Sequence, residues 1–361
     1  MARITFIGPV PPIRSGIAQH GGHLTETLAR DHDVTVLSWQ HQYPRLLFRR
    51  SQVDPTVERH PNARFTLRWW DPVSWWRAGR TGQESDLVVL VWTTPFHTLT
   101  YLVVLALTRR TRRVAIVHNA LPHEPLPFQR TLTRVVLGQC DGLIAHATTV
   151  ADELDELLGG KVDTVTVAHP SNIGVERKPL PPLDDGLRLL FLGFIRPYKG
   201  LDVALDALAE LGQRGVRPKL TVVGEPWDPA EPWAERVAER GLSEQVDLRL
   251  GYASDDEVER LLATHHAVLL PYRSATQSGI VPIALAAGRP VVATAVGGIA
   301  EVVEDGVNGT LATPGDADSL ADAIERCAAQ LTDLAAAATT VAESWDDVAA
   351  AVVKAARIDP S

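Results

Sequence analysis

Short apolar runs that alternate with helical patterns along the whole chain constrain its fold more than any other feature. Runs such as Leu87–Val91 and Leu187–Leu192 are almost wholly apolar, as strands are when both faces of a parallel sheet are buried. The segment Leu201–Leu211 instead repeats its apolar residues at helical spacing. Such alternation predicts the α/β class, with parallel sheets covered by helices on both faces.

The alternation forms two series, and the proline-rich stretch between them is typical of a linker. The predicted strands are Ile4–Ile7, Val34–Leu37, Leu87–Val91, Val114–Val117, Gly142–Ala145 and Thr164–Val167 in the first series, and Leu187–Leu192, Lys219–Val223, Val246–Leu248, Ala267–Leu270 and Pro290–Ala293 in the second. We therefore predict two doubly wound domains, residues 1–170 and 187–342, joined by a linker at 171–186. A last helix within 343–361 can pack back on the first domain.

Composition places the chain among folded soluble proteins. Its 361 residues exceed what one core usually supports, which agrees with two domains. Cys140 and Cys327 lie far apart and predict neither a disulfide framework nor a zinc site. We expect no signal peptide, and the longest apolar stretch, near Phe96–Leu107, is too short to span a bilayer. We expect a cytoplasmic protein.

Charge is unevenly distributed. Residues 1–140 carry 17 Lys and Arg against 9 Asp and Glu, whereas the remainder carries 18 against 35. A basic first half indicates an anionic partner. Charge alone does not select among a membrane, a nucleic acid and a phosphorylated substrate.

The loop after the predicted strand Leu187–Leu192 contains two cations, Arg196 and Lys199, and leads into a helix. A helix start attracts anions through its backbone N–H groups and its dipole, while arginine offers a planar fork and lysine a point charge. The pattern indicates a phosphate site. The alternative is a surface loop with two solvated cations.

Polar residues also follow strands of the first series. Gly16 lies in a proline-rich loop before a helix, and Ser15 is suited to cap that helix. His118 directly follows the strand Val114–Val117, where it can contact a substrate hydroxyl, shuttle a proton or simply bond to structure. Together with His123 and Glu124 it suggests a metal. Pro122 makes this segment a loop, however, and no further ligand cluster is evident, so we expect no metal there.

In the second series, Ser278 and Gly279 precede an apolar helix predicted at Ile280–Ala287. Gly297 and Gly298 form another backbone-permissive loop after the next strand. One interpretation is that these residues only form the turns between strands and helices of an ordinary α/β domain. The other is convergence of several helix starts and two cations beyond the carboxyl ends of the strands, in a cleft between the domains.

Several segments resemble the retaining glycosyltransferases of family 4, which have the GT-B fold. These segments are HNALPHE, FLGFIRPYKGLD, VVGEP, PYRSATQSGIVPIALAAGRPVVATAVGGIAEVVEDGVNG and the closing SWDDV. The resemblance implies two Rossmann-like domains facing a cleft, and transfer of a sugar from a UDP- or GDP-linked donor with retention of configuration. It implies a glycan, lipid-linked or small-molecule acceptor, as in polysaccharide biosynthesis, with no metal, no other cofactor and no nucleic acid.

The resemblance also implies roles for individual residues. Lys199 matches the family's lysine on the donor diphosphate, whereas Arg196 lies two positions beyond Phe194, where the family has its arginine. Both would stabilise charge on the leaving diphosphate, which itself would help to take the acceptor's proton in a front-face attack. His118 matches a histidine that orients the sugar.

At three further places of the predicted donor site, this sequence either matches the family or departs from it. Asn119 stands where Asp is common, and Gly16 matches the glycine-loop position that faces the donor phosphates. The family's glutamate pair corresponds to Ala275 and Ile283, which cannot accept hydrogen bonds through their side chains. The residues expected to take over donor contacts are Glu225, Gln277, Ser278, Gly279, Ile280 and Glu301. A nucleotide-sugar-binding pseudoenzyme or partner subunit is the alternative.

Four tryptophans interleave with arginines between Tyr43 and Arg80. They are Trp69, Trp70, Trp75 and Trp76. Amphipathic aromatic and basic residues suit the interface of an anionic membrane, which predicts a peripheral enzyme at the inner face of the membrane. The alternatives are tryptophans packed in the core and tryptophans stacked on a soluble sugar acceptor.

Overall fold

The computed structural model describes residues 1–44, 51–55, 57–122, 127–184, 186–228, 231–339 and 343–357. The chain forms two compact units. Unit 1 comprises Met1–Asn172 together with Glu343–Ser361, and unit 2 comprises Ile173–Ala342.

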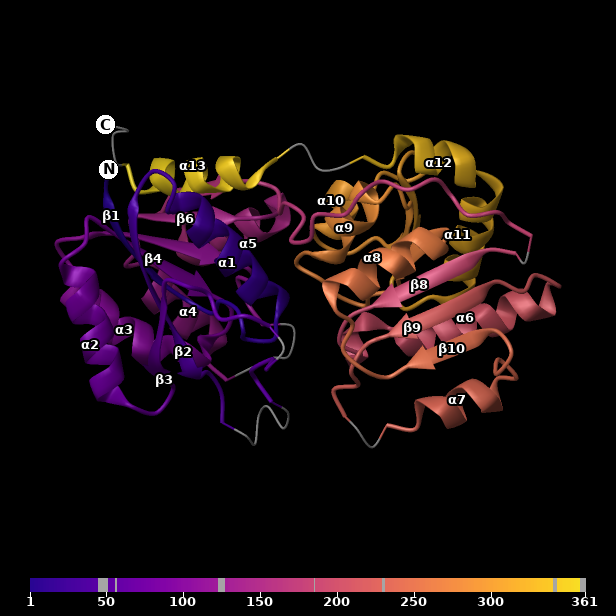
Figure 1. Ribbon diagram of the computed structural model, residues 1–361, viewed down its shortest axis with the longest axis horizontal. Coiled ribbons are helices and arrows are strands. Elements are labelled where there is room, and N and C mark those ends of the chain that lie inside the picture. The colour runs from indigo at the N-terminus through magenta and orange to yellow at the C-terminus, as the bar shows by residue number, and fades with distance from the viewer. Residues whose placement is uncertain are drawn as a thin grey trace. The chain divides into compact units, whose positions relative to one another are not determined.

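Unit 1 contains a seven-stranded parallel sheet in the order β3-β2-β1-β4-β5-β6-β7 (Figure 1). Its strands are β1 (Arg3–Ile7), β2 (Asp33–His41), β3 (Ala63–Arg68), β4 (Leu87–Trp92), β5 (Arg112–Val117), β6 (Gly142–Ala145) and β7 (Thr164–Thr166). Its helices are α1 (Gly16–Leu28), α2 (Pro72–Gln83), α3 (Thr98–Leu107), α4 (Gln129–Leu137), α5 (Thr148–Leu158) and α13 (Trp345–Ala355).

Both faces of the unit 1 sheet are covered. Alternate strand residues pack either with α2, α3, α4 and α5 or with α1 and α13. The helix α13 joins the second layer because Val348 and Val352 enter the core beside Leu24 of α1. The Trp345 indole also donates to the Ser171 carbonyl at 3.1 Å. The last helix therefore belongs to unit 1, next to α1 (Figure 1).

Unit 2 contains a six-stranded parallel sheet in the order β10-β9-β8-β11-β12-β13. Its strands are β8 (Arg188–Leu192), β9 (Lys219–Val223), β10 (Val246–Arg249), β11 (Ala267–Leu270), β12 (Val291–Thr294) and β13 (Gly309–Ala312). Its helices are α6 (Leu201–Gln213), α7 (Trp233–Glu239), α8 (Asp255–Thr264), α9 (Ile280–Ala286), α10 (Ile299–Val302), α11 (Ala317–Ala329) and α12 (Leu331–Ala337).

The unit 2 sheet is also covered on both faces. One core packs β8 and β9 against α6, α7, α11 and α12, and the other packs the opposite faces of the strands against α8, α9 and α10. Two doubly wound parallel sheets confirm the predicted α/β class. The helix predicted at Trp233–Arg240 is confirmed as α7. The elements that the sequence analysis missed are β3, α2, α3, β13, α10 and α12.

Candidate functional site

The loop after β8 is joined to the loop after β9 by backbone hydrogen bonds. The Ile195 amide donates to the Glu225 carbonyl, and the Trp227 amide donates back to the Ile195 carbonyl, each at 2.8 Å. These bonds extend the pairing of the two strands beyond their carboxyl ends. Because ligands of open α/β sheets bind at that edge, the loop lies where its cations can meet a ligand.

Gly200, at the start of α6, requires glycine for two reasons. Its φ of 66° lies in the left-handed region, and a Cβ there would stand 2.0 Å from the Pro271 carbonyl oxygen. The loop therefore approaches the end of β11 at backbone contact distance.

Lys199 lies over an aromatic ring. Its Nζ is 5.1 Å from the ring centroid of Tyr272, a buried residue just beyond β11. Burial would lower the pKa of Lys199, but the phenol groups of Tyr272 and Tyr198 outweigh it and raise that pKa above its usual value. The ammonium is thus charged and held in place, half-buried at the carboxyl edge of the sheet.

Arg196 is held in a similar way. Its guanidinium carbon stands 3.6 Å from the centroid of the Trp227 ring, which is the geometry of a stacked cation–π contact. Stacking occupies the face of the guanidinium and leaves its N–H edge for an anion. The sequence identified Arg196 as a cation of this loop, but Trp227 was not identified as its support.

A bidentate ion pair anchors the segment after β11. The two terminal guanidinium nitrogens of Arg273 donate to the Asp202 carboxylate, at 2.7 and 2.9 Å, and the Arg273 amide donates to the Tyr198 carbonyl at 2.7 Å. The guanidinium lowers the pKa of Asp202 even though burial alone would raise it. The loops after β8 and β11 are therefore locked to each other.

Gln277 and Ser278 lie half-buried between β11 and α9. The Ile280 amide donates to Ser278 Oγ at 3.3 Å, and α9 begins at Ile280 as predicted, with Gly279 as its first flanking residue. The Gly298 amide donates to the Thr276 carbonyl at 3.0 Å, which brings this segment beside the loop after β12.

Ala275 and Ile283, which occupy the positions of the family's glutamate pair, differ in their surroundings. Ile283 is only 4% exposed and packs in the core beneath α9, while Ala275 is partly buried against the same core. Glu225 is half-buried in the loop beside Gly193, and Glu301 is exposed on α10. Of the two residues expected to substitute, Glu225 is the one whose backbone carbonyl is hydrogen-bonded to the loop that contains Arg196 and Lys199, through the Ile195 amide.

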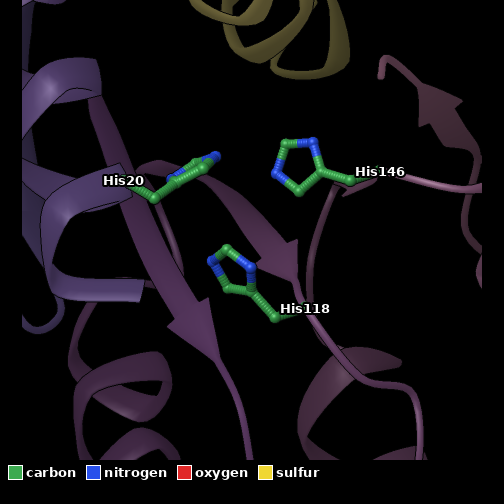
Figure 2. A group of neighbouring side chains, drawn as sticks. All are labelled: His20, His118 and His146. Atoms are coloured by element: carbon green, nitrogen blue, oxygen red, sulfur yellow. The ribbon is translucent and has the colours of Figure 1, made fainter. Parts of the chain in front are cut away.

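In unit 1, His118 follows β5 as the sequence predicts, and its ring is buried. His20 from α1 and His146 from the end of β6 lie beside it, with ring centroids 4.8 and 5.4 Å from that of His118 (Figure 2). His169 completes the cluster, 5.0 Å from His20. We call these four residues the histidine cluster. Sequence reasoning missed it because its members are widely separated in the chain.

Burial keeps the histidine cluster neutral. It lowers the pKa of His20 and of His118 well below the usual value, and that of His146 to about 3. Neighbouring imidazoles add to the effect. Neutral imidazoles can bind metals or exchange hydrogen bonds with hydroxyl groups.

The neighbouring predicted positions have simpler environments. Ser15 caps α1 by accepting from the Ala18 amide at 3.0 Å, and the exposed Gly16 accepts from the Asn172 side chain at 3.3 Å. Asn119 is half-buried after His118. The predicted metal alternative at His123 and Glu124 lies outside the described residues.

The four tryptophans divide into two groups. Trp75 is 8% exposed, and its indole donates to the Arg68 carbonyl at 2.7 Å, so it is a core residue and not a surface contact. Trp69 is half-buried and packs against the same core. Trp70 and Trp76 are about half exposed, at 49% and 52%. In the described ranges, no helix has the length and apolar content needed to cross a membrane.

The two parallel-sheet units place the protein in a known structural class. A UDP-bound protein of Anabaena, HepE, has a similar structure, with a TM-score of 0.72 and 19% identity, covering 98% of this chain and 97% of that one. Two parallel α/β units with this likeness have the GT-B fold.

Two family models then match most of the chain. The model described as Glycosyltransferase Family 4 matches residues 14–171, and the model described as Glycosyl transferases group 1 matches residues 186–330. The chain belongs to the group 1 glycosyltransferases of the family 4 type.

Curated relatives match over part of their length. An alpha-D-kanosaminyltransferase of Streptomyces kanamyceticus is 31% identical over 145 residues, which are 40% of this chain and 37% of that protein. A D-inositol 3-phosphate glycosyltransferase of Acidothermus cellulolyticus is 28% identical over 287 residues, 72% of this chain and 59% of that protein. The chain thus spans about half the length of the curated relatives it matches.

Proposed function

We propose that this protein transfers a sugar from a nucleotide-sugar donor to a hydroxyl acceptor, with retention of configuration. The observation that carries the proposal is the pair of cations beyond β8, each held against an aromatic ring: Arg196 on Trp227 and Lys199 on Tyr272. A diphosphate is the part of a nucleotide sugar that two fixed cations would bind best.

In the proposed reaction, the bond between the anomeric carbon and the diphosphate oxygen breaks while the acceptor oxygen bonds to the same carbon. The diphosphate gains negative charge as it leaves, and Lys199 and Arg196 stabilise that charge because they are already in position. The acceptor's proton passes to the departing phosphate oxygen, so the products are a glycoside and a nucleoside diphosphate. No metal ion is needed to neutralise the diphosphate in this scheme.

The remaining donor contacts are assigned from position. Glu225, whose carbonyl accepts from the Ile195 amide in the loop after β8, is the residue that we assign to the ribose hydroxyls. Gln277 and Ser278 are assigned to the sugar. His118 is assigned to orienting the donor sugar through a hydroxyl group. Glu301, Gly279, the Ile280 amide, Asn119 and Gly16 complete the proposed donor contacts.

The acceptor is proposed in two forms. Relatives that are named for D-inositol 3-phosphate favour a small polar acceptor. An acceptor at an anionic membrane surface is instead favoured by the exposed Trp70, just before α2, and by Val73, Trp76 and Arg77 on that helix. Under that second form, the enzyme would bind the membrane peripherally.

A panel of UDP-, GDP- and TDP-sugars, incubated with inositol phosphates, simple glycosides and lipid-linked acceptors, tests the proposal. Mass spectrometry should detect a glycoside and one nucleoside diphosphate per turnover. Binding of a donor without turnover across the panel would instead identify the pseudoenzyme that Ala275 and Ile283 suggest.

A further inference from the structure

Three imidazoles in unit 1 converge although they come from different elements. His20 lies on α1, His118 follows β5 and His146 follows β6 (Figure 2). One ring nitrogen from each can be chosen so that all three atoms lie within 4.8 Å of one another. All three side chains are buried.

The nitrogen atoms at the centre of this group lack the partners that buried polar atoms normally have. Both ring nitrogens of His20 and Nε2 of His146 are buried without a hydrogen-bond partner. Leaving such groups unsatisfied costs roughly 1–3 kcal/mol each, so native proteins seldom do it. A ligand that accepts one lone pair from each ring would remove the part of this cost that falls on the unprotonated nitrogens.

The orientation of His146 indicates which kind of ligand fits. Its Nδ1 contacts the Val167 carbonyl at 3.0 Å and must donate there, because a carbonyl oxygen can only accept. A neutral ring then presents the lone pair of Nε2 toward His20 and His118. Metal-bound histidines characteristically donate their second nitrogen to a backbone carbonyl in this way.

We propose that His20, His118 and His146 form a site for a divalent transition-metal ion, with Zn²⁺ as the best-matched ion. Three neutral nitrogen ligands favour zinc and its neighbours over Mg²⁺ or Ca²⁺, which prefer oxygen. With zinc–nitrogen bonds of about 2.0–2.1 Å, the nitrogen ligands of a tetrahedral site stand roughly 3.4 Å apart. The ring nitrogens here lie within 4.8 Å of one another, so each pair must approach by about 1.4 Å at most to bind the ion.

This site differs from one in which a metal ion bridges the donor diphosphate. Its ligands are imidazoles, whereas such an ion is held by carboxylates and phosphates. It has one consequence that rests on the proposed function. Since His118 is also assigned to the donor sugar, a bound metal occupies the imidazole that the sugar needs. Zinc should therefore inhibit transfer.

Metal binding is measured on the untagged full chain after dialysis against a chelator. Titration with Co²⁺ should give the visible ligand-field bands of a nitrogen-ligated ion, saturate at one equivalent and reverse when Zn²⁺ is added. X-ray absorption of the zinc-loaded protein should report at least three imidazole ligands. That reading needs no variant and therefore remains decisive if substituted chains fail to fold.

Variants locate the site. His20→Ala and His146→Ala should each raise the dissociation constant for Zn²⁺ by about 100-fold or more, since even outer-shell partners contribute 10–100-fold. His97→Phe is the matched control, because His97 is also buried with both ring nitrogens unpartnered but lies outside the cluster, and its affinity should be unchanged.

Absence of stoichiometric binding, or binding that both cluster variants retain, would overturn the metal site. Donor transfer by the metal-free protein is measured separately. Normal transfer without metal binding would remove this inference and leave the proposed function intact. Metal binding without any transfer would support the metal site and overturn the proposed function.

Discussion

Lys199 and Tyr272 form a cation–π pair in which the lysine Nζ stands 5.1 Å from the tyrosine ring centroid. The two residues follow different strands, β8 and β11, which are neighbours in the unit 2 sheet. The glycine at position 200 brings their backbones together, since a Cβ there would meet the Pro271 carbonyl. The position of the ammonium is therefore set by the topology of the sheet.

Replacement of Lys199 by methionine should reduce kcat about 100- to 1000-fold, the usual cost of losing one preorganised group that stabilises a leaving charge. Methionine keeps most of the length of the side chain without its charge. Steady-state kinetics with a saturating donor measure the effect. Lys219→Met, at the exposed amino end of β9, should leave kcat unchanged. Similar rates for both variants would remove Lys199 from the chemistry.

Arg196 should contribute mainly to donor binding. Arg196→Ala is expected to raise the dissociation constant for UDP or GDP about 10-fold or more, because a hydrogen bond to a charged group contributes about 1.5–3 kcal/mol. Trp227→Leu should raise it about 2- to 5-fold by removing the stacking. Calorimetric titration measures both constants.

The chain offers a matched control for this pair. Arg236 lies over Trp233 at 4.8 Å on α7, so it is a second arginine–tryptophan contact in unit 2. Arg236→Ala should bind the nucleotide as the unmodified protein does. Equal losses for Arg196→Ala and Arg236→Ala would indicate a general electrostatic effect rather than a site.

Gly200→Ala should destabilise unit 2 more than Gly215→Ala. Both glycines have positive φ, 66° and 80°, but a Cβ at Gly215 meets nothing within 4 Å. The Gly215 variant should lose about 1–2 kcal/mol of unfolding free energy from backbone conformation alone. Gly200→Ala adds a clash and should lose about 3 kcal/mol or more. Urea unfolding measures the difference, and equal losses would contradict the described contact with Pro271.

Acid should destabilise unit 1. Burial lowers the pKa of His97 and of His146 to about 3, whereas an unfolded histidine titrates near 6.5. The unfolded chain therefore binds more protons below pH 6.5, and stability is lost as the pH falls from about 6.5 toward 3. Each such histidine contributes roughly 1.4 kcal/mol per pH unit within that window.

His97→Phe tests this linkage. The ring stacks on Trp39 at 4.3 Å, and both of its nitrogens are unpartnered, so phenylalanine loses no hydrogen bond. Unfolding free energies measured between pH 7.5 and 5 should fall less steeply for the variant. An unchanged slope would show that His97 keeps an ordinary pKa in the folded protein.

The exposed tryptophans Trp76 on α2 and Trp70 just before it should govern membrane binding if the acceptor is a lipid. Trp76→Ser, combined with Trp70→Ser, should reduce co-flotation with anionic vesicles at moderate salt. Leu250→Ser, a comparably exposed apolar site in unit 2, is the control. No flotation by the unmodified protein would remove the membrane form of the proposal and leave the small-molecule acceptor.

Sequence pattern predicted the buried strands well because short, wholly apolar runs such as Leu87–Val91 are typical of strands buried inside parallel sheets. It missed β3, since an edge strand exposes alternate residues, and α2, whose tryptophans are divided between core and solvent. Lys199 was predictable from its place between a strand and a helix. Its aromatic support and the histidine cluster were not, because they depend on contacts between residues far apart in the chain.

The central claim is tested most directly by proton NMR of the anomeric signals during turnover of an active donor–acceptor pair. The account predicts a glycoside whose anomeric coupling matches that of the donor, with release of one nucleoside diphosphate for each bond formed. A product of inverted configuration, or a donor that binds and is never consumed by any acceptor in the panel, would contradict it.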